Sequence, residues 1–332
     1  MKVVTARLTH NVLSGPREEG EPVLFVHGNV SSAAFWRDIL GALPQPYRAL
    51  AVDLRGFGDS DPAPVDATRG LRDFSDDLVE LIEAMELGRV HLVGWSMGGG
   101  VIMQLLRDRP ALVRSLTLVN PVSPYGYSGT EGADGVLTHA DGTGSGAGAA
   151  NPDFLARLAK GDLSDEAATS PRSVFRSAYV ARPVPDEDFY VAAMLTTRVG
   201  EDNYPGDAAT SEAWPGVRPG TRGVLNALAP THFRIDDLHT IDPKPPILWI
   251  RGADDVIVSD ASLFDLAHLG GLGVVPGSPG TPAQPMVAQT RAVLERYGDY
   301  REVVLDECGH SPHLEHPEEF RRLLVEHLQS RR

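Results

Sequence analysis

The chain has 332 residues, of which 42% are hydrophobic and 23% charged, a composition that argues against a mainly disordered, collagen-like or coiled-coil protein. Its 30 Lys and Arg against 45 Asp and Glu give a net charge of −15, which disfavours binding to nucleic acid or to an acidic membrane surface. The length predicts one large domain or a domain with a substantial insertion.

Hydropathy along the chain predicts neither export nor membrane insertion. The amino-terminal segment Met1–Thr9 lacks the apolar core of a signal peptide. The most apolar uncharged stretch, Val90–Leu106, contains four glycines and falls short of the ~20 residues that cross a bilayer. We therefore expect a cytoplasmic protein.

Short apolar and β-branched runs recur along the chain and predict the strands of a mostly parallel sheet, with continuous apolar runs such as 90–93 and 246–250 at its centre. These strands are expected at Val23–Val26, Ala49–Val52, Val90–Val93, Leu116–Val119, Ile247–Ile250 and Val303–Leu305. Apolar residues at intervals of three and four predict helices at Phe74–Met85, Val101–Leu106 and Glu318–Leu328. The alternation of the two patterns is typical of an α/β fold with helices on both faces of the sheet.

The alternation stops in residues 121–240, which we interpret as a cap inserted into the core. Gly-rich loops such as 142–148 replace it, with helical patterns only at Asp153–Ala159 and Asp186–Leu195. The predicted division is a first core part at 1–120, the cap at 121–240 and a second core part at 241–332. Within the second part, Gly270–Pro285 is expected to be a loop.

The residues Gly94-Trp-Ser-Met-Gly98 form the pattern Gly-x-Ser-x-Gly between a predicted strand and a predicted helix. In this setting the pattern is typical of a nucleophile elbow, in which a serine occupies a tight strand-to-helix turn. The two glycines leave room for the turn to close, and the amide groups that begin the helix favour an anionic intermediate. We expect Ser96 to be a nucleophile.

With this elbow the chain resembles the α/β-hydrolase superfamily, in its capped serine hydrolase or esterase type. His27-Gly-Asn29 follows a predicted strand, as the family's oxyanion loop does, and Asp53–Ser60 is similar to the turn after the next strand. The similar segments cover about residues 20–120 and 245–330. The resemblance implies an α/β-hydrolase fold, with a mostly parallel sheet, flanking helices and an inserted cap.

The resemblance also implies an oxyanion hole made by the backbone N–H groups of Asn29 and Met97, because acyl transfer needs donors for the charge that develops. The side chain of Asn29 is a further candidate donor, with a hydrogen bond to its own turn as the alternative. We interpret His27 and the segment Arg55–Ser60 as structural parts that brace this loop.

A serine hydroxyl needs a general base that is itself oriented by a carboxylate. Asp254 and Asp255 follow the predicted strand Ile247–Ile250, and His310 follows Val303–Leu305, so all three are expected where parallel strands end. The family's order of nucleophile, acid and histidine implies His310 as the base, and its usual spacing selects Asp255 as the acid. Asp254 stays open as the alternative acid.

Three other side chains near His310 are interpreted as non-catalytic. His313 and His316 follow it at spacings of three, but prolines interrupt the local helix and no second set of ligands is present, so we expect no metal site. Cys308 is the only cysteine and has no base at a recognisable spacing, which predicts a buried, inert thiol. The reaction implied by the resemblance needs no cofactor.

These residues predict a serine hydrolase that cleaves a carboxylic ester or lactone of a small, largely apolar substrate through an acyl-enzyme. A serine at the elbow tells against the epoxide hydrolases and haloalkane dehalogenases of the superfamily, which use an aspartate there. The same three residues also support carbon–carbon bond hydrolysis, perhydrolysis or lyase chemistry. A non-catalytic ligand-binding member of the fold is the remaining alternative, against which a complete triad argues.

Large apolar side chains near the elbow and in the insertion are candidates for the wall of a substrate pocket. Each of them is also a candidate for simply holding the insertion to the core. The expected pocket residues are Trp95, Phe175, Tyr190, Met194 and Trp214.

Overall fold

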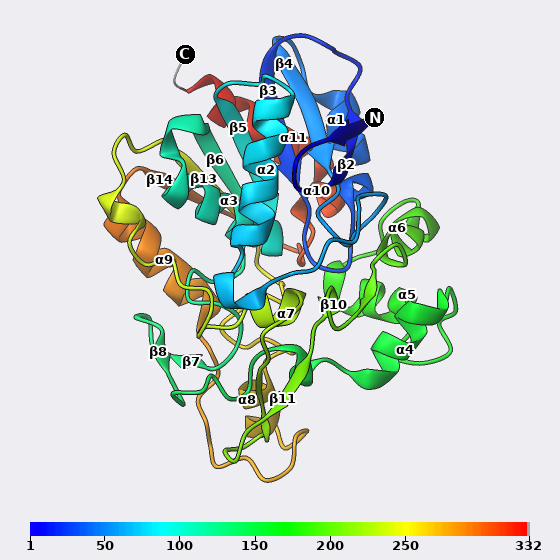
Figure 1. Ribbon diagram of the computed structural model, residues 1–332, viewed down its shortest axis with the longest axis vertical. Helices are drawn as coiled ribbons and strands as arrows, with labels where there is room; N and C mark the ends of the chain where they lie inside the picture. The colour runs from blue at the N-terminus through cyan, green and yellow to red at the C-terminus, as the bar shows by residue number, and fades with distance from the viewer. Residues whose placement is uncertain (331–332) are drawn as a thin grey trace.

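The computed structural model describes residues 1–330 and contains an eight-stranded sheet in the order β1-β2-β4-β3-β5-β6-β13-β14 (Figure 1). The strands are β1 (Lys2–Val4), β2 (Thr9–Ser14), β3 (Glu21–Val26), β4 (Tyr47–Val52), β5 (Val90–Trp95), β6 (Val113–Val119), β13 (Ile247–Gly252) and β14 (Tyr300–Leu305). The sheet is parallel from β4 to β14, and all six predicted strands lie inside it. The antiparallel strands β1 and β2 were not predicted, because this edge of the sheet is only half-buried and mixes polar with apolar residues.

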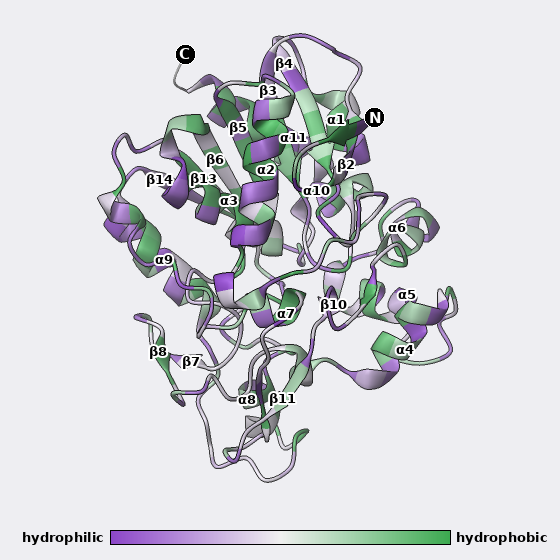
Figure 2. Cartoon of the chain, in the orientation of Figure 1, coloured by the Kyte–Doolittle hydropathy of each residue, from purple (hydrophilic) through white to green (hydrophobic). Residues whose placement is uncertain are grey.

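Helices cover both faces of the sheet, with α2 and α3 side by side on the face toward the viewer and α11 behind it (Figure 1). Figure 2 shows hydrophilic residues on the side of α2 that faces the viewer, although Asp73 and Asp77 of this helix are buried. The three predicted core helices are confirmed as α2, α3 and α11. The core helices are α1 (Arg37–Ala42), α2 (Arg72–Ala84), α3 (Met97–Asp108), α8 (Leu266–Gly271), α9 (Met286–Tyr297), α10 (Pro312–Glu315) and α11 (Pro317–Gln329), with 3₁₀ turns η1 (Ala33–Trp36), η2 (Ala67–Arg69) and η3 (Pro110–Leu112).

The segment between β6 and β13 consists of short elements below the sheet, on the side where β5 and β6 end (Figure 1). Its helices are α4 (Pro152–Lys160), α5 (Pro171–Val174), α6 (Glu187–Met194) and α7 (Val224–Ala227), with the π-turn η5 (Phe175–Tyr179) and the 3₁₀ turns η4 (Ala147–Ala149) and η6 (Leu238–Thr240). Its strands pair only locally and are β7 (Thr130–Glu131), β8 (Val136–Leu137), β9 (Val199–Gly200), β10 (Tyr204–Pro205), β11 (Ala208–Thr210) and β12 (Val217–Pro219). The two helices predicted in this segment are α4 and α6.

Local sequence signals explain where α4 begins and ends. The Asn151 side chain accepts hydrogen bonds from the backbone N–H groups of Asp153 and Phe154, and proline occupies the first helical position. Gly161 ends the helix in a left-handed conformation, with φ 69°.

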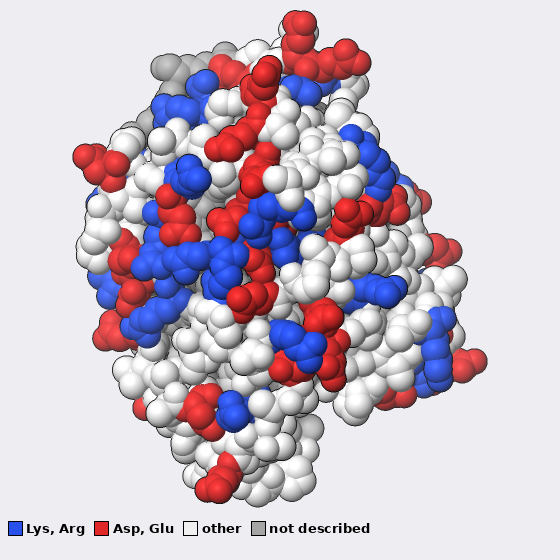
Figure 3. Space-filling view, in the orientation of Figure 1, with Lys and Arg blue, Asp and Glu red and all other residues white. Residues whose placement is uncertain are grey.

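Acidic and basic side chains are interspersed on the face shown in Figure 3, and the lower end around α8 and β11 carries few of either. The segment Gly270–Pro285 at this end has no charged residue and, beyond the last turn of α8, no helix or strand, so the predicted loop is confirmed. Within residues 1–330, no helix combines the length and apolar character that crossing a membrane requires.

Candidate active site

Ser96 lies between β5 and α3 with a left-handed backbone, φ 57° and ψ −121°, which strains a residue other than glycine. Close backbone packing produces this turn. A Cβ atom on Gly98 would lie 2.4 Å from the carbonyl oxygen of Val26, and one on Gly28 would lie 2.8 Å from Cβ of Ser96. Ser96 itself is half-buried, and its hydroxyl has no hydrogen-bond partner within residues 1–330.

The carboxyl ends of β13 and β14 bring Asp255 and His310 together. Nδ1 of His310 lies 2.8 Å from Oδ2 of Asp255, and each side chain is only 2% exposed. The other carboxylate oxygen accepts hydrogen bonds from the backbone N–H groups of Ile257 at 2.8 Å and Val258 at 3.1 Å. Because the carboxylate only accepts, the proton is on Nδ1 and Nε2 is left as a base.

Asp254, the alternative acid, is exposed, and its backbone N–H donates to the carbonyl of Cys308. Its side chain has no contact with His310 among the hydrogen bonds and ion pairs of residues 1–330. The geometry therefore favours Asp255 as the carboxylate that orients His310.

The two backbone amides expected to form the oxyanion hole, those of Asn29 and Met97, have no acceptor within the described part of the chain. That of Met97 is also the first amide of α3, at the positive end of the helix dipole. The Asn29 side chain accepts a hydrogen bond from the N–H of Val30 at 3.1 Å, which is the local role considered for it. Both backbone amides are thus available to an anion.

His27 and the turn after β4 hold the oxyanion loop from behind. Nε2 of His27 accepts a hydrogen bond from the N–H of Leu54 at 3.0 Å, so Nδ1 carries the proton and donates to the carbonyl of Gly28 at 2.7 Å. Burial lowers the pKa of His27. The carboxylate of Asp53 accepts from the N–H groups of Ala33 at 2.7 Å and Asp59 at 3.0 Å. These contacts agree with a structural interpretation of both segments.

The other two histidines after β14 diverge from His310. His313 is fully enclosed and stacks on Trp36, with ring centroids 4.2 Å apart, and burial lowers its pKa well below the usual value. His316 is partly exposed, and Nδ1 lies 3.0 Å from the guanidinium of Arg182. Within residues 1–330, no three His, Cys, Asp or Glu side chains are placed to hold a metal ion. Cys308 is buried, and burial raises the pKa of its thiol.

Three of the expected pocket residues belong to one buried aromatic cluster that reaches His310. Trp95 stacks on Phe35 at 5.2 Å, and Phe35 contacts Tyr190 at 5.1 Å. Phe175 stacks on Tyr190 at 6.0 Å, and the ring of Trp95 lies 5.3 Å from that of His310. Met194 is also buried and packs in the same core.

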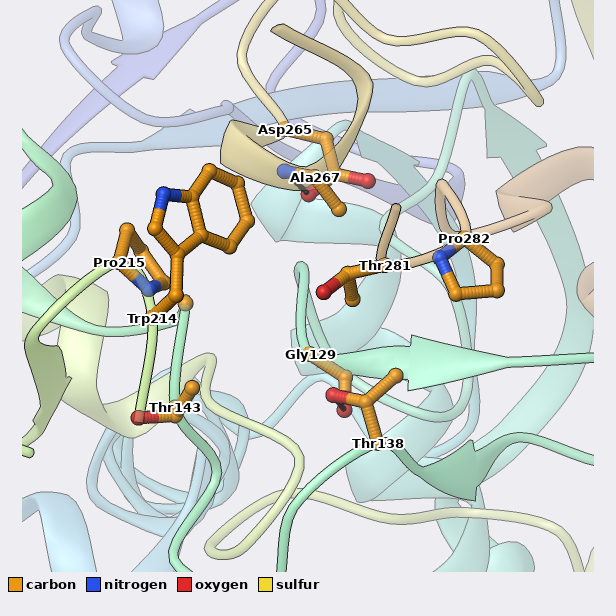
Figure 4. Close-up of a pocket in the computed structure, with 10 residues that line it drawn as sticks. Gly129, Thr138, Thr143, Trp214, Pro215, Asp265, Ala267, Thr281 and Pro282 are labelled. Atoms are coloured by element: carbon orange, nitrogen blue, oxygen red, sulfur yellow. Dashed lines mark hydrogen bonds between the residues drawn. The ribbon is translucent and has the colours of Figure 1, made fainter. Parts of the chain in front are cut away.

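The fifth residue, Trp214, lies elsewhere. Its indole N–H donates to the carbonyl of Pro276 at 2.8 Å, and its ring packs on Gly270. Figure 4 shows it on the wall of a small pocket whose other lining residues include Thr143, Asp265 and Thr281. Neither Ser96, Asp255 nor His310 lines this pocket, which holds about one water molecule.

The sequence matches the family described as "Alpha/beta hydrolase family" over residues 23–323. The chain belongs to this family. It is 46% identical over 112 residues to a Variovorax paradoxus (strain S110) protein named "Putative carbamate hydrolase RutD", a match that covers 33% of this chain and 41% of the relative. It is 34% identical over 120 residues to the 2-hydroxymuconate semialdehyde hydrolase of Pseudomonas sp. (strain CF600), covering 35% of this chain and 42% of that protein. The chain thus matches less than half the length of these curated relatives.

Among solved structures, this α/β hydrolase is similar to the esterase RhEst1 from Rhodococcus sp. ECU1013. The TM-score is 0.61 with 19% identity, and the match covers 99% of this chain and 98% of that one. This likeness confirms the α/β-hydrolase fold expected from the sequence.

Asn120 is a further residue of the candidate site, and sequence reasoning missed it. Its side-chain oxygen accepts a hydrogen bond from the N–H of Gly252 at 3.1 Å, and its amide donates to the carbonyls of Gly309 at 3.1 Å and His310 at 2.8 Å. It therefore ties the end of β6 to the acid-bearing strand and the histidine loop. The signal in the sequence was an asparagine directly after a predicted strand, which turn propensity alone explains equally well.

Proposed function

We propose that this α/β hydrolase is a serine hydrolase that cleaves carboxylic esters, including lactones, of small and largely apolar molecules. The observation that carries the proposal is the buried contact of 2.8 Å between His310 and Asp255 at the sheet edge where the strained Ser96 turn lies. A binding protein has no need of a serine in a strained elbow, nor of a histidine whose tautomer is fixed by a carboxylate.

The proposed reaction follows from the hydrogen bonds of the site. Oγ of Ser96 attacks the acyl carbonyl as its proton passes to Nε2 of His310, whose Nδ1 is held by Asp255. The free N–H groups of Asn29 and Met97 bind the oxyanion, and His310 then protonates the leaving alcohol. Water, activated in turn by His310, hydrolyses the acyl-enzyme and releases the acid.

Carbon–carbon bond hydrolysis is the second candidate, favoured by the partial match to a hydrolase named for 2-hydroxymuconate semialdehyde. The same serine, histidine and aspartate would serve both reactions, so the substrate must decide between them. Turnover of p-nitrophenyl butyrate and of 2-hydroxymuconate semialdehyde should be compared as kcat/KM. A higher value for the ester supports our proposal, and a higher value for the semialdehyde would replace it.

Covalent labelling tests the serine mechanism itself. A fluorophosphonate should modify one residue, and peptide mapping should place the label on Ser96. The matched control is Ser14→Ala, which alters an exposed serine at the end of β2 and should leave labelling and turnover unchanged. A label mapped to another residue would refute the assignment.

A further inference from the structure

A four-residue segment of the insertion, Tyr179–Arg182, contacts two of the loops that carry candidate catalytic groups; we call it the brace segment. It begins at the last residue of the π-turn η5, a distortion that is often found at functional sites. On one side it meets the oxyanion loop, and on the other it meets the loop of His310.

Tyr179 makes the contact with the oxyanion loop. Its hydroxyl lies 2.9 Å from the carbonyl oxygen of Asn29 and 3.2 Å from that of Val30, so one donor faces both carbonyls. The side chain is nearly buried, and its ring lies edge-on to His310 with centroids 6.2 Å apart. The hydroxyl thus fixes the peptide units next to the proposed oxyanion donor of Asn29.

Ala181 makes the contact with the histidine loop through a buried carboxyl group. Its backbone N–H donates to Oε2 of Glu315 at 2.7 Å. Oε1 of the same carboxyl group accepts from the N–H groups of Gly309 at 2.9 Å and Ser311 at 3.3 Å, the residues on either side of His310. Glu315 is only 6% exposed. Its side chain therefore joins the insertion to the backbone that carries His310.

Two further contacts show how tightly the brace segment is seated. A Cβ atom on Gly309 would lie 2.7 Å from the backbone nitrogen of Ala181, so the two backbones approach at a distance that only glycine permits. The guanidinium of Arg182 donates to the backbone carbonyl of Glu315. The segment is therefore held to α10 by its backbone as well as by a side chain.

We propose that the brace segment positions the oxyanion loop and the histidine loop as one unit, with Tyr179 and Glu315 as positioning residues. Neither loop is part of the sheet ladder, and small misplacements of catalytic groups reduce turnover strongly. The seating of the insertion is thereby coupled to the chemistry of the core. This inference rests on the proposed serine hydrolase function.

The test compares Tyr179→Phe, Glu315→Gln and the double variant with two controls. Tyr179→Phe keeps the ring and removes the donor. Glu315→Gln keeps the shape but places an amide N–H against one of the N–H groups that the carboxyl group accepts. The controls are Tyr204→Phe, another buried tyrosine of the insertion, and Asp186→Asn, whose carboxylate pairs with Arg37 of the core at the surface.

Turnover of p-nitrophenyl butyrate should be measured per active site titrated with fluorophosphonate, together with KM and the melting temperature. We expect kcat to fall about tenfold in each single variant, the effect of roughly one hydrogen bond lost from the transition state, with KM changed by less than about twofold. The controls should keep the kcat of the parent protein. The double variant should lose less than the product of the single losses, because both changes release the same segment.

Three results would overturn the inference. A lower melting temperature with unchanged kcat per titrated site would mean that the brace segment only stabilises the fold. A raised KM with unchanged kcat would make Tyr179 a substrate contact. Losses that multiply in the double variant would show two independent contacts. Failure of the proposed function is a separate result, since the parent protein would then show no labelling at Ser96.

Discussion

The sheet and the insertion between β6 and β13 contribute to the same candidate site by different physical means. In the sheet, buried strands fix the backbone before Ser96 and Asp255, and His310 follows the partly buried edge strand β14. In the insertion, the elements are short, and arginine side chains such as Arg176, paired with Asp165 and Glu187, hold them together at the surface. Surface ion pairs stabilise little, whereas buried apolar strands stabilise strongly. We therefore expect the sheet to determine the chemistry, and the insertion outside the brace segment and the buried aromatic cluster to be freer to vary.

The first test of this comparison asks whether Ser96 in the elbow is the nucleophile. Ser96→Ala should lower kcat for p-nitrophenyl butyrate on the order of 10⁶-fold, as loss of a nucleophilic serine does in a comparable triad. The fold should survive, because the substitution removes only a hydroxyl that has no hydrogen-bond partner among the described residues. Kinetic assays of the purified variant measure kcat, and its circular dichroism spectrum, compared with that of the parent protein, checks the fold. A variant that retains appreciable turnover would contradict the role of the elbow.

The two aspartates after β13 provide the next test. Asp255→Asn should reduce kcat by ~10⁴-fold, because the amide no longer holds the tautomer of His310 in which Nε2 is a base. Asp254→Asn changes an exposed side chain and should reduce kcat by less than about threefold. Steady-state kinetics of the pair measures the difference, and equal losses would remove the choice between them.

Glycine substitutions test how rigid the core elbow is. Gly98→Ala places a methyl group 2.4 Å from the carbonyl of Val26, and this overpacking should destabilise the fold by about 3 kcal/mol. Gly41→Ala in α1 meets no atom within 4 Å and should instead stabilise by about 0.5–1 kcal/mol. Urea unfolding of both variants gives the free energies. Similar values for the two would show that the elbow tolerates movement.

Acid should weaken the core through two histidines, His91, which is buried, and His327, which is partly buried. Burial lowers the pKa of His91 on β5 and of His327 on α11 to about 4, so both stay neutral in the folded protein at a pH where the unfolded chain binds protons. The contribution of each histidine to the free energy of unfolding is complete above pH ~6.5 and is lost as the pH falls toward 4. Between pH 7 and pH 5 this loss is about 2 kcal/mol for each histidine.

Urea unfolding at pH 7 and pH 5 measures this loss. His327→Gln retains a donor for the carbonyl of Leu116, which lies 3.0 Å from Nε2, and removes the titration. The variant should therefore lose less stability between the two pH values than the parent protein does. An unchanged difference would mean that His327 does not contribute to the acid sensitivity.

The smallest expected effect concerns selectivity. Phe175→Leu alters the aromatic cluster beside His310 and should shift the ratio of kcat/KM for p-nitrophenyl octanoate over butyrate by about tenfold. Trp214→Leu alters an aromatic residue of the insertion that packs on Gly270 instead, and should leave that ratio within about twofold. The same shift in both variants, or in neither, would mean that the cluster does not line the acyl pocket.

The strands and main helices could be predicted because buried elements carry strong periodic patterns, as Val90–Val93 and Phe74–Met85 do. Ser96 was identified because the elbow adds a pattern with a known structural demand at the end of such a strand. Asp255 and His310 were identified by the order and spacing that the family resemblance implies. Side-chain contacts between residues that are far apart in the sequence could not be predicted from local patterns. Nothing local to Glu315 indicates that its carboxyl group reaches Ala181, and nothing local to Trp214 indicates that it packs on the loop after α8 rather than beside His310.

Cys308 gives the molecule an experimental advantage. It is the only cysteine, its side chain is buried, and burial raises the pKa of its thiol, so alkylating reagents at neutral pH should react with it slowly. A cysteine placed at an exposed position of the insertion, such as Leu163, which is 52% exposed, would then be the one fast-reacting thiol in the chain. A fluorophore attached there would report how the insertion moves while the native sequence around His310 stays intact.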